Sequence, residues 1–231
     1  MDAIRNFFSI FTDAKLMRLF ADGCLETLYM VLVTTAVSYV LGLPLGVILA
    51  ITDKNGICRN KPVNFALGVI VNILRSIPFL ILLVAVMPFT TFVVGKSYGS
   101  TATIVPLVIA AAPFIARMVE SSLKEVDAGI IEAAESMGST PFQIIWKVLL
   151  PEARPSLIVG AAIAITTILG YSAMAGFVGG GGLGTIAVNY GYYRYDNKTM
   201  LATVCLLVII VQIFQEVGML IAKRTDRRIT H

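Results

Sequence analysis

The sequence predicts an all-α membrane protein with five transmembrane helices. Of its 231 residues, 57% are hydrophobic and only 14% are charged, and the mean hydropathy is +0.85. Because a soluble globular domain carries about 25% charged residues, this composition argues against that class. The apolar residues also form long runs, and a helix needs about 20 such residues to cross a hydrocarbon core of about 30 Å.

Five runs in the sequence are long enough to be spans, and each is nearly free of charge. The predicted spans are residues 24–51, 63–94, 100–118, 156–178 and 199–222. The first holds Glu26 near its start, the second holds Arg75, and the last holds Glu216. Together these runs predict a transmembrane domain over residues 24–222, with one long polar connection at residues 119–155.

The two ends of the chain are more polar than the spans. Residues 1–23 alternate apolar and charged side chains, which predicts an amphipathic helix lying in the membrane interface. They lack the basic start, short apolar core and small-residue cleavage site of a signal peptide. Residues 223–231 form a basic tail.

The basic residues predict how the chain is oriented in the membrane. Five spans place the two ends on opposite sides, and cytoplasmic loops hold an excess of Lys and Arg. The larger set on one side is Lys54, Arg59, Lys61, Arg117, Lys124, Lys147, Arg154, Lys223, Arg224, Arg227 and Arg228. The opposite set is Arg5, Lys15, Arg18, Lys96, Arg194 and Lys198. We therefore expect the N-terminus outside, the C-terminus in the cytoplasm, and residues 119–155 in the cytoplasm.

Small residues and prolines mark where the spans pack closely or bend. Gly42, Gly46 and Ala50 recur at four-residue spacing, which places them on one helix face and lets another helix approach. Pro78 and Pro88 interrupt the second run. We expect a tilted, kinked helix there, followed by a short extracellular piece.

The polar segment 127–151 carries the signals of two short helices. Asp127 is placed to cap the first helix, and Gly138 to end it. The run "TPFQ" starts the second, with Thr140 as N-cap, proline at the first helical position and Gln143 completing a capping box. Pro151 is expected to end it.

The first of these helices offers a patch of small residues beside acids. Ala133, Ala134 and Gly138 would let another protein approach closely, and Glu132 and Glu135 would orient a basic partner. The alternative is a solvated connecting loop, which would need neither tight caps nor compaction. The capping signals favour a docking segment.

This segment resembles the EAA signature of the membrane subunits of ABC importers. The string "EAAESMG" at residues 132–138, followed after nine residues by "VLLP" at 148–151, departs from the usual signature only by Val148 in place of Ile. The resemblance implies the type I ABC importer permease fold and a coupling helix that docks on an ATP-hydrolysing subunit. The docking residues it implies are Glu132, Ala133, Ala134, Gly138, Leu150 and Pro151.

A narrower resemblance covers much of the chain. "GYSAMAGFVGGGGLGTIAVNYGYYRY" at residues 170–195 and "MLATV" at 200–204 are similar to the permease subunit of bacterial methionine importers. This implies a homodimer in the bacterial cell membrane, two ATPase subunits that bind ATP and Mg²⁺, and an external substrate-binding protein, often a lipoprotein. The implied substrate is D- or L-methionine, or both. Alternatives are an importer for another small amino acid or a short peptide, or an ATPase-independent channel or carrier.

A zwitterionic amino acid with a thioether needs polar groups for its ends and an adaptable apolar wall. The candidate pathway residues are Asn72, Arg75, Tyr171, Ser172 and Met174. An ionisable group such as Arg75 within a span usually faces the bundle interior or a water-filled cavity. The alternatives are snorkelling or pairing with backbone carbonyls for Arg75, and ordinary helix packing for the others.

The run "GGGGLG" at residues 179–184 is not a nucleotide-binding loop. It lacks the Lys-Ser/Thr pair of a P-loop and has no βαβ context. We interpret it as a flexible outer hinge, because glycines permit a tight turn there. The predicted hinge residues are Gly179, Gly180, Gly181, Gly182 and Gly184. A plain flexible loop is the alternative.

The sequence holds no set of residues that predicts catalysis on this chain. It has one histidine, no metal-ligand cluster and no nucleophile paired with a base. Cys24, Cys58 and Cys205 lack metal-binding or redox spacing, so we interpret them as small apolar residues. We therefore predict a transport subunit with no metal or cofactor of its own.

Overall fold

The computed structural model describes residues 14–225, and within that range it contains helices and turns but no strands. This confirms the predicted all-α class. The chain divides into two compact units, and the four long helices contribute to both. Unit 1 is formed by the described residues of Met1–Ala36, Pro78–Val108 and Ile165–Phe214; unit 2 by those of Val37–Ile77, Ile109–Ala164 and Gln215–His231.

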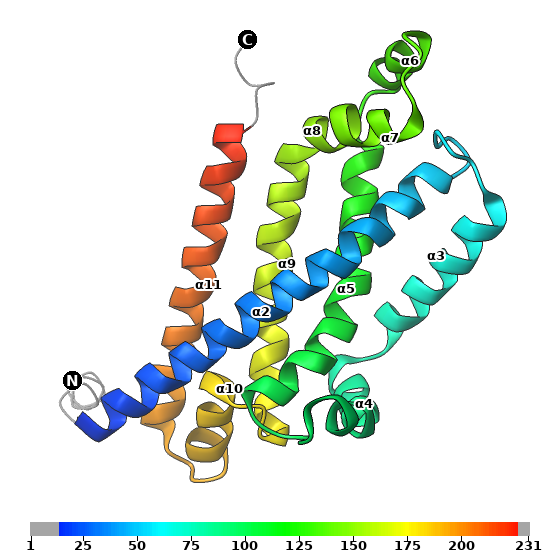
Figure 1. Ribbon diagram of the computed structural model, residues 1–231. Helices are drawn as coiled ribbons and strands as arrows, with labels where there is room; N and C mark the ends of the chain where they lie inside the picture. Colours follow the sequence, from blue (N-terminus) through cyan, green and yellow to red (C-terminus); the bar gives the residue numbers. More distant parts are fainter. Residues whose placement is uncertain (1–13, 226–231) are drawn as a thin grey trace. The chain divides into compact units, whose positions relative to one another are not determined.

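The long helices supply the membrane spans (Figure 1). Four helices are long and apolar enough to cross a bilayer alone: α2 (Ala14–Thr52), α5 (Ser100–Lys124), α9 (Arg154–Ala175) and α11 (Asn197–Thr225). Helices α3 (Lys61–Ser76) and α4 (Phe79–Val94) have 16 residues each, short of the ~20 that one span needs. Counted as one broken span, they bring the described residues to five, as the composition predicts.

The second predicted span is therefore two helices, not one kinked helix. Ile77 leaves the helical conformation, with φ −79° and ψ 123°. The cause is the following proline, since the ring of Pro78 disfavours the α conformation in the preceding residue. Helix α4 then continues through Pro88 and ends at Gly95, whose φ is +81°. Pro88 does not end the helix.

Some helices begin or end away from the boundaries expected from charge. Residues 14–23 continue without a break into α2, and residues 1–13 of the predicted interfacial helix lie outside the described part of the chain. Helix α5 runs past residue 118 to Lys124. Lys223 and Arg224 of the predicted tail lie in the last turn of α11, and residues 226–231 are outside the described range.

In unit 2, α2 and α5 approach closely at the predicted small residues. A Cβ on Gly42 would lie 2.8 Å from the carbonyl oxygen of Ala112, and one on Gly46 would lie 2.5 Å from that of Ala116. Neither distance leaves room for a side chain. The four-residue glycine spacing therefore marks a helix contact, as predicted.

Gly46→Ala is expected to destabilise the protein, because its methyl group would press on Ala116 and on Val119, 2.6 Å away. Overpacking of this kind costs about 1–3 kcal/mol. The matched control is Gly170→Ala in α9, where a Cβ would meet nothing within 4 Å. Thermal unfolding of the detergent-solubilised protein measures both variants. Equal melting temperatures for the two would contradict the contact.

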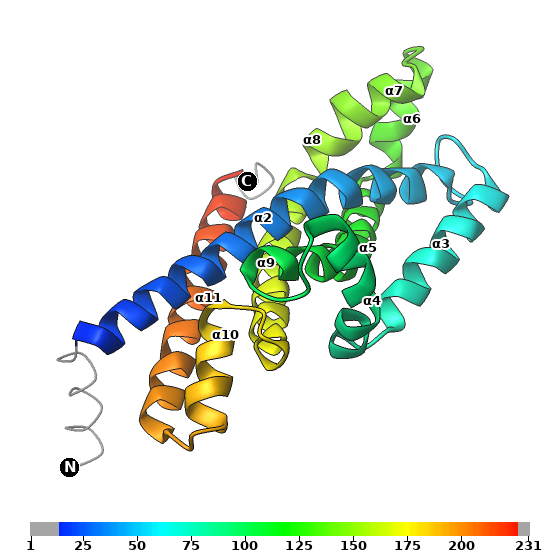
Figure 2. The ribbon, with the colours of Figure 1, turned by 60° about the horizontal axis from the view of Figure 1, so that its bottom comes forward.

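Unit 1 contains the short elements that follow α9. A 3₁₀ turn (Gly176–Val178) leads into α10 (Gly182–Ile186), which continues as a π-helical turn (Ala187–Tyr192). Figure 2 shows this element alongside the first turns of α11. The two pack closely, since a Cβ on Gly191 would lie 2.8 Å from the Cβ of Met200.

Candidate functional site

The predicted docking segment connects α5 to α9 within unit 2. It consists of α6 (Ala128–Ser136), α7 (Pro141–Ile144), a π-helical turn (Ile145–Leu149) and α8 (Leu150–Glu152). Figure 1 shows α6 and α7 beyond the ends of α5 and α9. The segment is therefore a compact structured unit rather than an extended loop.

The helix caps in this segment are those the sequence predicts. The Asp127 carboxylate accepts a hydrogen bond from the Gly129 N–H at 2.8 Å. The Thr140 hydroxyl accepts one from the Gln143 N–H at 3.4 Å, and the Gln143 side chain accepts one from the Thr140 N–H at 2.9 Å. Gly138 has φ +77°, a left-handed conformation that favours glycine. The Asp127 bond fixes the start of α6, and the bonds between Thr140 and Gln143 fix the start of α7 after the turn at Gly138.

Pro151 does not end the second helix, contrary to the sequence prediction. The chain stays helical through Pro151 to Glu152, after a wide turn in which the Leu150 N–H bonds to the Ile145 carbonyl. A proline ring clashes with the carbonyl four residues earlier and donates no hydrogen bond. The π-helical turn before it accommodates the ring.

One face of the docking segment is buried against α5. Ala134 is only 3% exposed, and it belongs to one buried cluster with Ile144, Leu149 and Val119 of α5. Leu150 is partly buried against the same cluster. Ala134 therefore anchors the segment in its own chain, and Leu150 packs beside it; their predicted contact with a partner stays a prediction. The sequence alone does not show that Ala134 is buried while Ala133 is exposed, because both faces of α6 carry small residues.

The other predicted docking residues are on the surface. Glu132, Ala133, Gly138 and Pro151 are exposed. They keep the predicted combination of small side chains and a carboxylate. A partner can reach them without displacing the buried anchor.

Three large apolar side chains of the same segment are also exposed, and the sequence analysis missed them. Met137 is 79% exposed, Phe142 73% and Trp146 65%. Phe142 and Trp146 are four residues apart, a spacing that places them on one side of a helix. Exposed apolar groups at this density mark an interaction surface. We define the docking surface as Glu132, Ala133, Met137, Gly138, Phe142 and Trp146.

The candidate pathway residues divide between the two units. Asn72 and Arg75 lie on α3 in unit 2, and both are exposed. The Asn72 side-chain oxygen accepts a hydrogen bond from the Arg117 guanidinium at 2.9 Å. Its oxygen is therefore already bound to this chain. Arg75 remains a candidate pathway residue.

Tyr171, Ser172 and Met174 lie on α9 in unit 1. The Tyr171 ring stacks on Phe79 of α4, with centroids 4.6 Å apart and planes within 8°. The Ser172 hydroxyl is 1% exposed and donates to the Leu169 carbonyl at 2.8 Å, so it is occupied by its own helix. Met174 is exposed. Tyr171 and Met174 therefore fit a pathway wall better than Ser172 does.

The glycine run forms a turn that only glycine adopts easily. Gly179, Gly181 and Gly182 have φ values of +73°, +87° and +67°. Gly184 lies against α9, where a Cβ would be 2.5 Å from the Ala173 carbonyl oxygen. The predicted tight turn is therefore present.

The same turn is anchored by hydrogen bonds within unit 1, and its role as an outer hinge stays a prediction. The Gly182 N–H donates to the Glu26 carboxylate at 2.6 Å, and the Leu183 N–H donates to the Thr27 hydroxyl at 2.9 Å. The Gly180 carbonyl accepts from the Thr103 hydroxyl at 3.1 Å. These bonds hold the turn to α2 and α5.

A charged network on α5 is a second feature that the sequence analysis missed. The Glu120 carboxylate accepts from the Arg117 guanidinium at 2.6 Å and from the Lys124 ammonium at 2.8 Å. Lys124 also pairs with Asp53 at 2.8 Å, just after α2. The hydrogen bond from Lys124 and that from the Lys54 N–H hold the pKa of Asp53 below its usual value. The spacing of Arg117, Glu120 and Lys124, three and four residues apart on one helix, could have predicted these ion pairs.

Metal chemistry has no support in the described residues. No group of three or more His, Cys, Asp or Glu side chains between residues 14 and 225 is arranged to hold a metal ion. Cys24, Cys58 and Cys205 are free thiols.

Comparison with known families and proteins gives a consistent result. The family described as "Binding-protein-dependent transport system inner membrane component" matches residues 42–231. The probable D-methionine transport system permease protein of Vibrio cholerae is 54% identical over 203 residues, covering 88% of this chain and 90% of that protein. The D-methionine transport system permease protein of Escherichia coli K12 is 52% identical over 161 residues, covering 70% and 74%.

Solved structures extend the comparison to the fold. A chain of the MetNI methionine ABC transporter in an inward-facing conformation matches with a TM-score of 0.92 at 48% identity, covering 93% of this chain and all of that one. A chain of an amino acid ABC transporter matches with a TM-score of 0.76 at 19% identity, which shows a shared fold.

Proposed function

Because the chain belongs to the family of binding-protein-dependent transport system inner membrane components, we propose that it is the permease subunit of an ATP-driven methionine importer. It is an ABC importer permease, a transport subunit rather than an enzyme. In this proposal it acts as a homodimer, binds no cofactor itself, and relies on two partner subunits that bind Mg²⁺ and ATP. An external substrate-binding protein delivers the amino acid.

The observation that carries the proposal is the docking segment. Its caps and its buried anchor hold it rigid, while the docking surface is left exposed on it. A rigid exposed surface with apolar side chains suits a second protein subunit. We place the ATP-hydrolysing subunit there, so that its movements are passed to α5 and α9, the helices that the segment joins.

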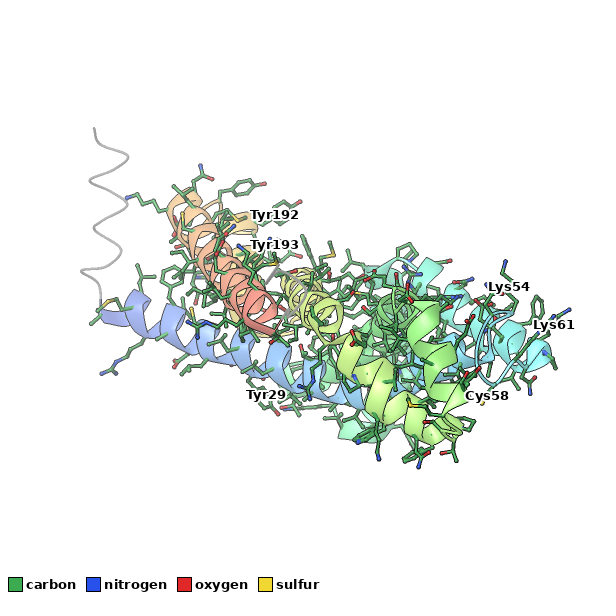
Figure 3. The ribbon with its side chains drawn as sticks, turned by 90° about the horizontal axis from the view of Figure 1, so that it is seen from above. Tyr29, Lys54, Cys58, Lys61, Tyr192 and Tyr193 are labelled. Carbon is green, nitrogen blue, oxygen red and sulfur yellow. The ribbon has the colours of Figure 1, made fainter. Side chains whose placement is uncertain are left out.

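The excess of basic residues supports the proposed orientation, with the N-terminus outside and the C-terminus in the cytoplasm, and the division into units is compatible with it. Unit 2 holds all three connections expected in the cytoplasm: the one between α2 and α3, the docking segment, and the end of α11. Figure 3 shows Lys54, Cys58 and Lys61 around the first of these. Unit 1 holds the connections expected outside, including the glycine turn. Transport then proceeds by alternating access of the pathway to the two sides.

Methionine is the proposed substrate because relatives at 54% and 52% identity are described as D-methionine permeases. Arg75, Tyr171 and Met174 supply a charge, an aromatic face and a flexible apolar group that suit a zwitterion with a thioether. Another small amino acid or a short peptide is the second candidate.

Uptake competition tests the substrate. Cells that express the chain with its ATP-binding and substrate-binding partners take up labelled methionine, and each unlabelled competitor is added in excess. We expect D- or L-methionine to abolish the uptake, and polar amino acids and dipeptides to leave it unchanged. No saturable uptake of labelled methionine, together with saturable ATP-dependent uptake of one of those solutes when it carries the label, would replace methionine as the substrate.

A further inference from the structure

We propose that Glu120 is a positioning residue that makes α3 move together with the docking segment during transport. This inference rests on the proposed function and deepens it. It assigns the transmission of motion to a charged network within unit 2, in addition to the direct connections of the docking segment to α5 and α9.

Glu120 lies at the centre of the network. Its side chain is 7% exposed, and it accepts hydrogen bonds from two cations of its own helix, Arg117 and Lys124. A buried carboxylate is stable only when cations or donors compensate it. Because Glu120 has both, it fixes the positions of two long side chains that would otherwise have many conformations.

Arg117 extends the network to α3. Its guanidinium donates to the Gly68 carbonyl oxygen at 3.2 Å and to the Asn72 side-chain oxygen at 2.9 Å. The same guanidinium donates to Glu120, so three groups on two helices share one planar cation. Arg75, a candidate pathway residue, follows on α3 one turn after Asn72. The network therefore holds the helix that carries Arg75.

Lys124 extends the network toward the docking segment. It is the last residue of α5 and pairs with Asp53 at the end of α2. Asp53 and Lys124 line a cavity of about 290 Å³ together with Ile131 of α6 and Leu149 of the π-helical turn. A shift of the docking segment therefore changes the surroundings of the Asp53–Lys124 pair directly.

The charges of the network are balanced, so the ion pairs between its residues can persist as the helices move. Two cations and two carboxylates compensate one another, and the bonds join α5 to α3 and to Asp53, just after α2. The Glu120 carboxylate at the centre is buried, and hydrogen bonds between ionised groups are shorter and stronger than those between neutral groups. In this proposal, a movement of α5 is passed to α3 through the hydrogen bonds of Arg117.

The test measures how many ATP molecules are hydrolysed for each methionine taken up, using the whole complex in proteoliposomes. Glu120→Gln keeps the size of the side chain and removes its charge. We expect uptake to fall about tenfold while ATP hydrolysis continues, within the ~5–150-fold range typical of coupling between sites. The control is Glu125→Gln, which removes an exposed carboxylate just after α5.

A second variant guards against misfolding of the first. Arg117→Gln cuts the link to α3 and leaves Glu120 paired with Lys124. We expect the same loss of coupling, and no further loss when both changes are combined, since they interrupt one path. Normal coupling in Arg117→Gln would overturn the proposal. The proposal would also be overturned if the loss of coupling in the double variant equalled the product of the losses in the two single variants.

The two proposals fail in different ways. If the unmodified complex shows no ATP-dependent methionine uptake, the proposed function is wrong, and the coupling role falls with it. If the unmodified complex transports methionine and both variants transport it as well as the unmodified complex does, only the role of Glu120 is wrong.

Discussion

Ala133→Trp is expected to prevent binding of the ATP-hydrolysing subunit. Ala133 is an exposed residue of the docking surface, so a large ring there leaves the fold intact and blocks close approach by a partner. We expect the amount of ATP-binding subunit recovered in co-purification to fall about tenfold or more, equivalent to ~1.4 kcal/mol of binding free energy. ATP-dependent uptake should fall with it.

Ser97→Trp is the matched control, because it places the same ring at an exposed position in unit 1. It should leave co-purification unchanged. Glu132→Gln and Gly138→Ala should give intermediate losses, the first by removing a charge and the second by straining a residue at φ +77°. Full recovery of the ATP-binding subunit with Ala133→Trp would contradict the docking role.

Gly182→Ala is expected to destabilise the protein strongly, through two separate effects in unit 1. The residue has φ +67°, and an added Cβ would lie 2.5 Å from the Thr27 hydroxyl oxygen and 2.9 Å from Met30. The left-handed conformation and the overpacking together cost about 2–5 kcal/mol. The methyl group would also disturb the bond from the Gly182 N–H to Glu26. Thermal unfolding in detergent measures the loss.

Gly179→Ala separates the two causes. This glycine has nearly the same backbone conformation, φ +73°, but an added Cβ would meet nothing within 4 Å. Only the conformational cost of about 1–2 kcal/mol remains. If both variants unfold at the same temperature, the close packing of the turn against α2 contributes nothing to stability.

Local signals in the sequence predicted the docking segment well. The caps at Asp127 and Thr140 depend on neighbouring residues, and both formed as expected. The helix contact at Gly42 and Gly46 was also predicted, because small residues four positions apart lie on one face of a helix and let another helix approach. Family resemblance then added the partner and the substrate, which no local rule contains.

Features that depend on tertiary packing were missed. Ala133 and Ala134 are adjacent residues of the same type, yet Ala133 is exposed and Ala134 is buried. The position of α5 decides which side of α6 faces inward. Lys124 was assigned to the cytoplasmic connection at residues 119–155, although α5 continues through it. The anchors of the glycine turn at Glu26 and Thr27 were not foreseen, because they are remote from it in the sequence.

The most direct test of this account is methionine uptake into proteoliposomes that hold the chain and its ATP-binding subunit, with the substrate-binding protein outside and ATP inside. We predict accumulation of labelled methionine against its gradient, lost when ATP is omitted, when the ATP-binding subunit is absent, or when Ala133 is replaced by Trp. Equal uptake without ATP or without the ATP-binding subunit would contradict the account, and would identify the chain as an ATPase-independent channel or carrier.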